Sequence, residues 1–415
     1  MENYMNNMGT LAKKASRELL QIDTTTKNKI LEEMATALLD NIDFIQKENK
    51  KDLLKGKEKG LTSAFIDRLT LTEDRIIGMA KGIQTIINLK DPIGEILSGF
   101  RHENGMEISQ IRVPLGVIGM IFESRPNVTV DAAVLSLKSG NAIILRGGSD
   151  ALHSNMALAK VIIEAGRKVG LPVGAIQLVE NTDRNCVTQL ITMNKFVDVI
   201  IPRGGKGLKQ AILNNASVPV IETGAGLCHT YVDNKANIDM ALDIIVNAKT
   251  SRPGVCNAME TLLIHKDTVS ILLPRLGDLL DSLGVEVRGD KRAIKYLNNA
   301  TPTTDEDWNT EYLDLILSIK TVDSIEDAIT HIDTYSTKHS EAIITEDYEN
   351  SQKFLKSVDS AAVYINASTR FTDGSVFGFG GEIGISTQKL HARGPMGIKE
   401  LTSVKYIIRG NGQIR

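Results

Sequence analysis

The chain has 415 residues, of which 42% are hydrophobic and 24% are charged, a composition typical of globular proteins. At roughly 150 residues per domain, this length predicts two to three domains. The 48 basic and 51 acidic residues leave a formal net charge of −3. That balance argues against a protein that binds nucleic acid through a broad basic face.

The chain has three cysteines, Cys186, Cys228 and Cys256. A sparse, odd set of this kind is not a disulfide framework, and no CxxC pair suggests a zinc ribbon. We therefore expect a reducing, cytoplasmic compartment. The apolar stretches are shorter than the roughly 20 residues of a membrane span, so neither a secretory signal nor a membrane partner is expected. No histidine has metal-ligand spacing, so no metal is expected.

The first ninety residues predict a series of helices. The segment Thr70-Leu71-Thr72-Glu73 resembles a capping box, because Glu73 stands three residues after Thr70. Apolar residues then recur at helical spacing and predict one buried face: Ile76, Ala80, Ile83 and Ile87.

Residues 94–113 predict a β-hairpin. Two alternating segments, 96–100 and 107–113, flank a turn at Asn104-Gly105, which is a strong hairpin signal. The segment 402–408 also alternates and is expected to pair with the hairpin, in this chain or in a partner. Because exposed strand edges need a partner, the hairpin points to a homo-oligomer.

From residue 115 onward, strands and helices alternate. The expected strands are 116–122, 142–145, 175–179, 197–201 and 218–222, and the expected helices between them are 128–138, 154–169, 186–193 and 208–215. This alternation predicts a parallel sheet with helices on both faces, as in doubly wound dinucleotide-binding domains. A second α/β unit follows over 228–379, with expected strands at 261–264, 315–319, 341–344 and 362–365.

Two glycine-rich turns follow strands of the first sheet. One is Arg203-Gly204-Gly205-Lys206-Gly207 and the other is Arg146-Gly147-Gly148-Ser149. Neither is a P-loop or a GxGxxG motif, and one such turn alone is equally well an ordinary βα turn. Two in one sheet favour a nucleotide site, because bare backbone N–H groups can meet a phosphate there. Arg146 suits a 2′-phosphate and favours NADP over NAD, although Asp150 is close.

The glycine cluster 378–384 lies late in the chain and opens no βαβ unit, so it predicts a structural loop.

Cys256 lies in the segment 250–258, a predicted loop that also contains Pro253 and Gly254. Functional residues concentrate on such loops, whereas a lone cysteine is more often a small buried residue. We interpret Cys186 and Cys228 as packing residues. His229 follows Cys228, so the residues alone leave a Cys256–His229 dyad open.

Several segments, in order along the chain, resemble the aldehyde dehydrogenase superfamily: 116–127, 203–207, Glu222-Thr223-Gly224-Ala225-Gly226 and the loop around Cys256. More specific motifs resemble the gamma-glutamyl phosphate reductase family within it: 122–128, 251–257, 363–370 and 391–397. The resemblance covers nearly the whole chain. It implies an α/β fold with a doubly wound cofactor domain, an α/β catalytic domain and a small β oligomerisation element.

On this basis we expect an NADP-binding domain over 1–93 and 114–226 and a catalytic domain over 227–385. The oligomerisation hairpin and tail would take 94–113 and 386–415. The resemblance implies NADPH-dependent reduction of L-glutamyl 5-phosphate to L-glutamate 5-semialdehyde, with release of phosphate, in proline biosynthesis. Cys256 falls on the family nucleophile, whose thioester accepts hydride more readily than a carboxylate. Because acyl phosphates hydrolyse, transient contact with the upstream glutamate kinase is an attractive expectation.

The resemblance also implies roles for residues around the reacting carbonyl. Asn127 is expected to donate to the oxyanion together with the Cys256 backbone N–H, and Arg125 to contact a substrate carboxylate or phosphate. Glu222 matches the superfamily's general base. Since phosphate rather than water is the acyl partner here, we interpret Glu222 as positional or nicotinamide-facing.

Glu311 resembles the glutamate that holds the nicotinamide ribose, although Leu313 and Asp314 replace the superfamily's phenylalanine and glycine. The segment Ser368-Thr369-Arg370 is expected to bind the anionic substrate. The competing interpretation is that these residues only cap a loop.

Three alternatives remain at this point. A hydrolytic NAD(P)-dependent aldehyde dehydrogenase would give a free acid without needing phosphate. A cysteine hydrolase would use Cys256 with His229 and need no nucleotide. A metabolic scaffold would keep the fold without the activity.

Overall fold

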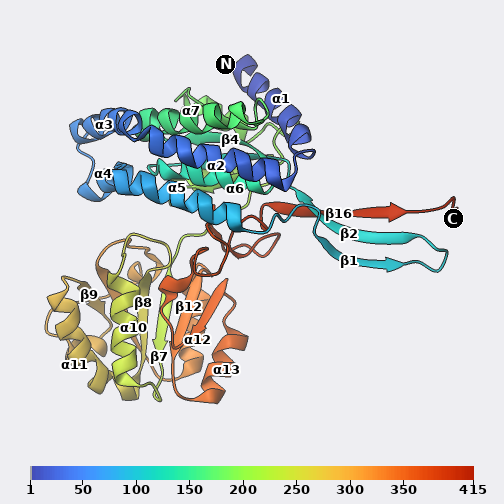
Figure 1. Ribbon diagram of the computed structural model, residues 1–415. Coiled ribbons are helices and arrows are strands. Elements are labelled where there is room, and N and C mark those ends of the chain that lie inside the picture. Colours follow the sequence, from blue (N-terminus) through green and yellow to red (C-terminus); the bar gives the residue numbers. More distant parts are fainter. Residues whose placement is uncertain (1) are drawn as a thin grey trace. The chain divides into compact units, whose positions relative to one another are not determined.

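The computed structural model describes residues 2–415, apart from the side chains of Glu2, Ala64 and Lys206. The chain divides into two compact units, whose elements are labelled in Figure 1. Unit 1 comprises the residues up to Glu222 together with Gly378–Gly384 and Met396–Arg415, and unit 2 comprises Thr223–Phe377 and Ile385–Pro395. No described helix is both long and apolar enough to cross a membrane.

Unit 1 begins with helices, as predicted: α1 (Glu2–Leu19), α2 (Thr24–Asp40), α3 (Ile42–Glu58), α4 (Ser63–Leu69) and α5 (Glu73–Asn88). The apolar face of α5 is confirmed, with Ile76, Ala80 and Ile83 buried. The capping box at Thr70 is wrong. Thr72 is the N-cap and accepts from the Arg75 N–H at 3.2 Å, whereas the Thr70 hydroxyl donates back to Ile66 at the end of α4.

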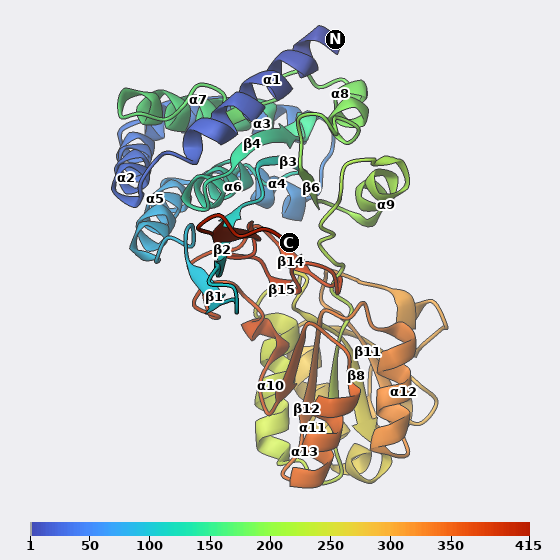
Figure 2. The ribbon, with the colours of Figure 1, turned by 90° about the vertical axis from the view of Figure 1, so that its right-hand side faces the viewer.

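The parallel sheet of unit 1 has the strand order β5-β4-β3-β6. The strands are β3 (Val117–Phe122), β4 (Ala142–Gly147), β5 (Ile176–Leu178) and β6 (Val199–Arg203). The connecting helices are α6 (Asn127–Lys138), η1 (Ser149–Ala151), α7 (Leu152–Lys168), α8 (Arg184–Leu190) and α9 (Lys206–Asn215). Helix α1 packs across β3, β4 and β5, and α6 and α7 pack against each other and against the sheet (Figure 2). The predicted α/β architecture of this unit is confirmed.

The fifth predicted strand of this sheet, 218–222, is wrong. Within the described residues this segment makes one isolated bridge, between Val220 and Ile200 of β6. Pro219 has no N–H to donate to a ladder, and the Val218 N–H turns away to Ile191 at 3.1 Å.

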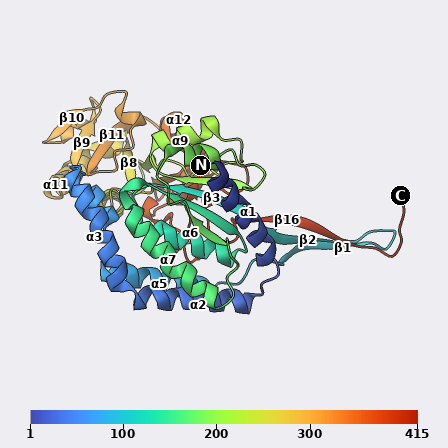
Figure 3. The same cartoon turned by 90° about the horizontal axis from the view of Figure 1, so that it is seen from above.

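A separate antiparallel sheet of unit 1 has the order β1-β2-β16. Its strands are β1 (Ile96–Arg101), β2 (Glu107–Pro114) and β16 (Thr402–Arg409). The β1–β2 hairpin is confirmed, and β16 pairs with β2 of this same chain from Thr402↔Pro114 to Arg409↔Glu107. Figure 3 shows the strands extending together away from the helices of unit 1.

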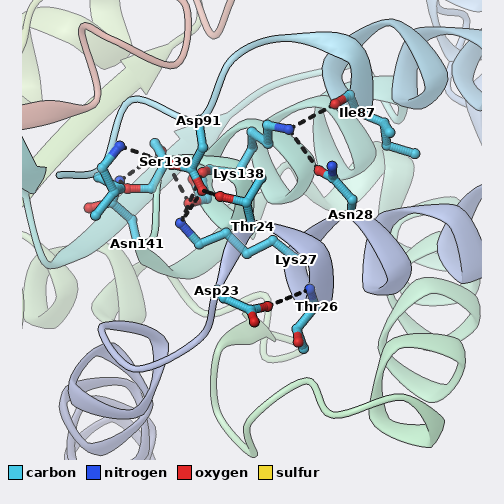
Figure 4. Close-up of polar contacts among 12 residues, drawn as sticks. Asp23, Thr24, Thr26, Lys27, Asn28, Ile87, Asp91, Lys138, Ser139 and Asn141 are labelled. Atoms are coloured by element: carbon cyan, nitrogen blue, oxygen red, sulfur yellow. Dashed lines mark hydrogen bonds and ion pairs between the residues drawn. The ribbon is translucent and has the colours of Figure 1, made fainter. Parts of the chain in front are cut away.

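A buried polar cluster joins the base of this sheet to the helices (Figure 4). Lys27 of α2 bonds Asp91 at 2.9 Å, just before β1. Lys138 of α6 donates to the Asn28 side chain at 2.7 Å and to the Ile87 carbonyl at 2.9 Å, and burial lowers its pKa. Asn141 donates to the Leu401 carbonyl at 2.8 Å, next to β16. The cluster therefore ties the base of the sheet, where β1 and β16 begin, to α2, α5 and α6.

Unit 2 contains a parallel sheet of order β10-β9-β11-β8-β7-β12-β13. Its strands are β7 (Cys228–Val232), β8 (Met259–His265), β9 (Glu286–Gly289), β10 (Ala300–Pro302), β11 (Ile316–Val322), β12 (Ser340–Ile344) and β13 (Ala362–Ile365). The helices between them are α10 (Ile238–Thr250), α11 (Lys266–Ser282), α12 (Ile325–Tyr335) and α13 (Tyr348–Ser357). The expected strands at 261–264, 315–319, 341–344 and 362–365 are confirmed.

Each face of the unit 2 sheet has its own apolar core. Leu262 and Ile264 of β8 pack with α10 and α11, whereas Leu263 packs with α12 and Phe354 of α13. Successive strand residues point to opposite faces, so a single buried strand supplies both cores. Unit 2 also contains the short turns η2 (Ala293–Tyr296), η3 (Asp307–Asn309) and η4 (Thr369–Phe371), and the pair β14 (Ile385–Ser386) and β15 (Gly394–Pro395).

Candidate active site

Cys256 lies in unit 2 on a loop between α10 and β8, hereafter the Cys256 loop (residues 251–258). Cys256 is partly exposed, whereas Cys186 and Cys228 are buried. The Ala258 N–H donates to the Val255 carbonyl at 3.1 Å, which closes a tight turn around Cys256. The thiol predicted as nucleophile is therefore the partly exposed one.

The backbone of Cys256 is held from the side of β7. A Cβ atom at Gly226 would lie 1.5 Å from the Cys256 carbonyl oxygen, so only glycine fits there. The Cys228 thiol donates to that same oxygen at 3.2 Å. Glu311 accepts from the Gly226 N–H at 2.6 Å and so holds Gly226 against the Cys256 loop.

The segment Ser368-Thr369-Arg370 lies against the Cys256 loop. The Thr369 hydroxyl donates to the Asn257 carbonyl at 2.7 Å, and Arg370 donates through Nε to the Ser251 hydroxyl at 3.0 Å and through Nη1 to the Asn257 side chain. Ser368 caps η4 by accepting from the Arg370 N–H at 3.3 Å. Burial, reinforced by neighbouring Arg252, lowers the pKa of Arg370. In the structure these side chains brace the loop.

Sequence reasoning missed Asn257, whose side chain donates to the carbonyls of Arg370 at 3.2 Å and Thr372 at 2.9 Å. Its position directly after Cys256, in the motif at 251–257, was the available signal.

The Cys256–His229 dyad is wrong. His229 is fully buried, and its Nδ1 lies 3.0 Å from a Glu341 carboxylate oxygen. Cys228 and His229 are consecutive on β7 but have different partners. Cys228 bonds the Cys256 carbonyl, whereas the His229 ring packs edge-on against His331 of α12.

In unit 1, the glycine turn at 146–149 begins at the end of β4. Arg146 donates to the carbonyls of Gly147 and Thr182, both at 3.1 Å, and burial lowers its pKa. Its buried Nε has no partner among the described residues, so the guanidinium has a donor to spare for an anion. Asp150, the acid beside the turn, is paired with Lys59 at 2.7 Å.

The glycine turn at 203–207 leads into α9, whose N-cap is Gly205. The Gly205 N–H donates to the Glu123 carboxylate at 2.9 Å, and a Cβ at Gly204 would lie 2.5 Å from the same oxygen. A helix N-terminus favours a negative group, and here a carboxylate of the chain provides it. A phosphate fits this position by taking the place of Glu123. The side chain of Lys206 lies outside the described residues, and Gly207 has open space around it.

Asn127 is the first residue of α6 and is exposed. Its side-chain amide donates to Asp131 at 2.8 Å, where burial raises the pKa of the carboxyl to about 6. An amide nitrogen carries two hydrogens, so a second donor remains. Arg125 and Glu222 are both partly buried and also belong to unit 1. The predicted residues are thus divided between the units: those up to Glu222 lie in unit 1, and Cys256, Glu311 and 368–370 lie in unit 2.

Comparison with known proteins places the chain among aldehyde dehydrogenases. The aldehyde dehydrogenase family model matches residues 2–294 and 298–407. The gamma-glutamyl phosphate reductase of Francisella philomiragia is 60% identical over 408 residues, covering 98% of this chain and 99% of the relative. That of Clostridium novyi is 57% identical over 415 residues, covering 100% of each.

Solved structures agree. The crystal structure of gamma-glutamyl phosphate reductase from Thermotoga maritima matches with a TM-score of 0.96 at 46% identity, covering 99% of each chain. An acetylating aldehyde dehydrogenase from Geobacillus thermoglucosidasius, at 19% identity, shares the fold with a TM-score of 0.72, covering 100% of this chain and 98% of that one. The chain therefore belongs to the aldehyde dehydrogenase family and, within it, to the gamma-glutamyl phosphate reductases.

Proposed function

We propose that the protein reduces L-glutamyl 5-phosphate to L-glutamate 5-semialdehyde with NADPH, releasing phosphate, as a step of proline biosynthesis. The observation that carries the proposal is the Cys256 loop. It presents one partly exposed thiol on a backbone held by Gly226, Cys228 and Thr369, in a chain 60% identical to a protein that bears this reductase's name.

The chemistry begins at the Cys256 thiolate. Its sulfur attacks the acyl phosphate carbonyl carbon, the carbon–oxygen bond to phosphate breaks, and a thioester remains on Cys256. When bound, NADPH supplies the hydride that the thioester carbonyl accepts. The resulting thiohemiacetal oxyanion collapses to the aldehyde by breaking its bond to sulfur, which releases the Cys256 thiolate for the next turnover.

Unit 1 contributes the groups proposed to stabilise charge. The Asn127 amide would use the donor that Asp131 does not take to bond an oxyanion of the tetrahedral intermediates, a role proposed also for the Cys256 backbone N–H of unit 2. Arg125 would contact a substrate carboxylate or phosphate. Because phosphate leaves and no water attacks, Glu222 serves as a positional or nicotinamide-facing group.

Unit 2 contributes Arg370, whose guanidinium would face the anionic substrate while bracing the loop, with Ser368 and Thr369 behind it. Glu311 has one oxygen on Gly226. The carboxylate still has capacity to accept a bond from a nicotinamide ribose hydroxyl.

The preference for NADPH over NADH rests on Arg146. Its spare Nε–H suits a 2′-phosphate, and Lys59 occupies Asp150, the acid that would otherwise bind a free ribose hydroxyl. Gly147, Gly148 and Ser149 would line this part of the site. The turn at 204–207 would take the other phosphates at the start of α9.

We further propose that the protein is a homo-oligomer and that it contacts glutamate kinase transiently. The β1-β2-β16 sheet would supply the oligomer interface. It carries exposed apolar side chains, among them Phe100, Tyr406 and Ile408, and β1 and β16 lie at its edges.

The direct test runs the reaction in reverse. Purified protein given glutamate semialdehyde, phosphate and NADP⁺ should form NADPH in proportion to phosphate, and Cys256→Ala should abolish turnover with NADPH binding nearly unchanged. NADPH formation without phosphate would instead favour the hydrolytic dehydrogenase. Absence of all turnover by folded, NADPH-binding protein would favour a scaffold.

A further inference from the structure

A buried ion pair connects the two ends of the Cys256 loop. Lys249 stands at the end of α10 and Glu260 is the second residue of β8. Their Nζ and Oε2 atoms are 2.6 Å apart, and both side chains are fully buried. Because the pair is isolated from solvent, the pKa of Glu260 is raised to about 7 and that of Lys249 is lowered.

The other oxygen of Glu260 makes a second connection. It accepts from the Leu313 N–H at 3.1 Å. Leu313 has a φ of 55°, a left-handed conformation that is strained for a bulky residue and persists only when its surroundings impose it. Two residues earlier, Glu311 holds Gly226 against the Cys256 carbonyl. One carboxylate therefore anchors both the Cys256 loop and the segment that holds Gly226 in place.

A buried pair of this kind is poorly explained by stability alone. Removing two charges from water costs about as much as their attraction returns, and well-packed apolar residues often do as well or better. An apolar pair at these positions would keep the loop ends packed. It would leave the Leu313 N–H without its acceptor and release the strained turn that carries Glu311.

We propose that Lys249 and Glu260 are positioning residues for the Cys256 nucleophile. Lys249 orients the Glu260 carboxylate, which sets both the loop and the Gly226 contact. The proposal rests on the proposed function, in which Cys256 is the nucleophile. Neither residue needs to touch the substrate.

Two double variants test this, because single variants would leave an uncompensated buried charge. Lys249→Met/Glu260→Leu removes both charges and the acceptor for Leu313. Lys249→Met/Glu260→Gln removes both charges and keeps an acceptor oxygen. The matched control is Lys27→Met/Asp91→Leu, which removes another buried pair whose carboxylate also accepts a backbone N–H, that of Ile93 at 2.9 Å.

The primary measurement is the rate at which iodoacetamide alkylates Cys256, read by mass spectrometry, with buried Cys186 and Cys228 as internal references. Since a displacement of about 1 Å at a reacting group costs about 100-fold in rate, we expect kcat of the leucine variant to fall on the order of 30- to 100-fold. The alkylation rate, which follows the exposure and the thiolate fraction of Cys256, should differ from that of wild type by about threefold or more. KM and the NADPH dissociation constant should change little. The glutamine variant should keep a kcat roughly three- to tenfold below that of wild type, and the control should keep the wild-type alkylation rate.

A cooperatively unfolding leucine variant with wild-type alkylation and kcat would overturn the proposal. If that variant does not fold, the glutamine variant decides, and a kcat and an alkylation rate both equal to those of wild type overturn the proposal. Alkylation does not require turnover. Failure of the phosphate-dependent reaction in wild-type protein would therefore count against the proposed function and not against this positioning role.

Discussion

Gly226→Ala is the sharpest single test of how the nucleophile is held. The added methyl carbon would lie 1.5 Å from the Cys256 carbonyl oxygen, 2.3 Å from its carbonyl carbon and 2.6 Å from its Cα. All three are backbone atoms, so no side-chain rotation relieves the clash. Ordinary contact begins near 3.4 Å, so the two segments must separate by roughly 2 Å, with about 1–3 kcal/mol of strain.

A shift of that size moves the thiol away from its attacking position. Because misplacing a reacting group by about 1 Å costs about 100-fold, we expect kcat to fall at least about 100-fold. NADPH binding, which the proposal assigns to unit 1, should be preserved. The assays are phosphate-dependent NADPH formation, Cys256 alkylation and NADPH titration.

Gly78→Ala is the matched control, because a methyl at Gly78 meets nothing within 4 Å on the surface of α5. It should keep wild-type kcat and gain about 0.5–1 kcal/mol of stability from helix propensity. If Gly226→Ala showed wild-type kcat and alkylation, the argument that Gly226 sets the position of Cys256 would fail.

Three further predictions concern the cofactor site and stability. Arg146→Ala should weaken NADPH binding by roughly 10- to 100-fold through loss of charge-assisted hydrogen bonds and leave NADH binding almost unchanged. Equal losses for both cofactors would contradict the assignment of Arg146 to the 2′-phosphate. Glu123→Gln should tighten NADPH binding by roughly two- to fivefold, because the carboxylate competes for the start of α9, and weaker binding would count against this. Hydrogen bonds from Thr304, Arg288 and Tyr312 outweigh burial and lower the pKa of Asp307 to about 2. Since the folded-state pKa lies below the unfolded one, this carboxylate stabilises the fold above pH about 4, and the contribution is lost towards pH about 2. Asp307→Asn should therefore be less stable than wild type by roughly 2 kcal/mol at pH 6 in urea titrations, and the difference should close on acidification. Equal stability of the two proteins at pH 6 would show that the contacts of Asp307 do not stabilise the fold.

The parts of the fold that could be predicted are those in which local pattern and tertiary burial agree. The run at 117–122 is uniformly apolar and becomes a fully buried strand, and Asn104-Gly105 forms the hairpin turn. The wrong predictions, the capping box at Thr70 and the strand at 218–222, each have a local physical cause. Thr72 competed with Thr70 for the cap, and Pro219 removed a donor from an otherwise strand-like run. Strands β9 and β10 are short and partly exposed, so they lack the apolar run that marks the others.

The site divides in the same way. The loop position of Cys256 could be predicted because the segment around it has a recognisable sequence. Gly226, Glu311 and Thr369 were also singled out, but their contacts that hold this loop could not be predicted. Glu311 reaches Gly226 across 85 positions of sequence, and Thr369 reaches Asn257 across 112. Nothing local marks such pairs, since the topology of the sheet brings them together. The same holds for Glu123, whose partner Gly205 lies 82 positions away on the neighbouring strand's turn.

The contacts around Cys256 point to a nucleophile whose position is set before substrate arrives. Two segments distant in sequence, 226–228 and 368–370, meet the loop through its backbone and through Asn257 and Ser251. Glu311 in turn holds Gly226 of the first segment. Such contacts remove the freedom of the chain that carries the thiol, and preorganisation of this kind is worth several kcal/mol of barrier. Thr369 and Arg370 contact the loop directly, and under the proposed function Arg370 is the member of that segment with a charge to offer an acyl phosphate. Replacing Thr369 with Val, which keeps shape and removes the hydroxyl donor, should therefore lower kcat more than it raises KM.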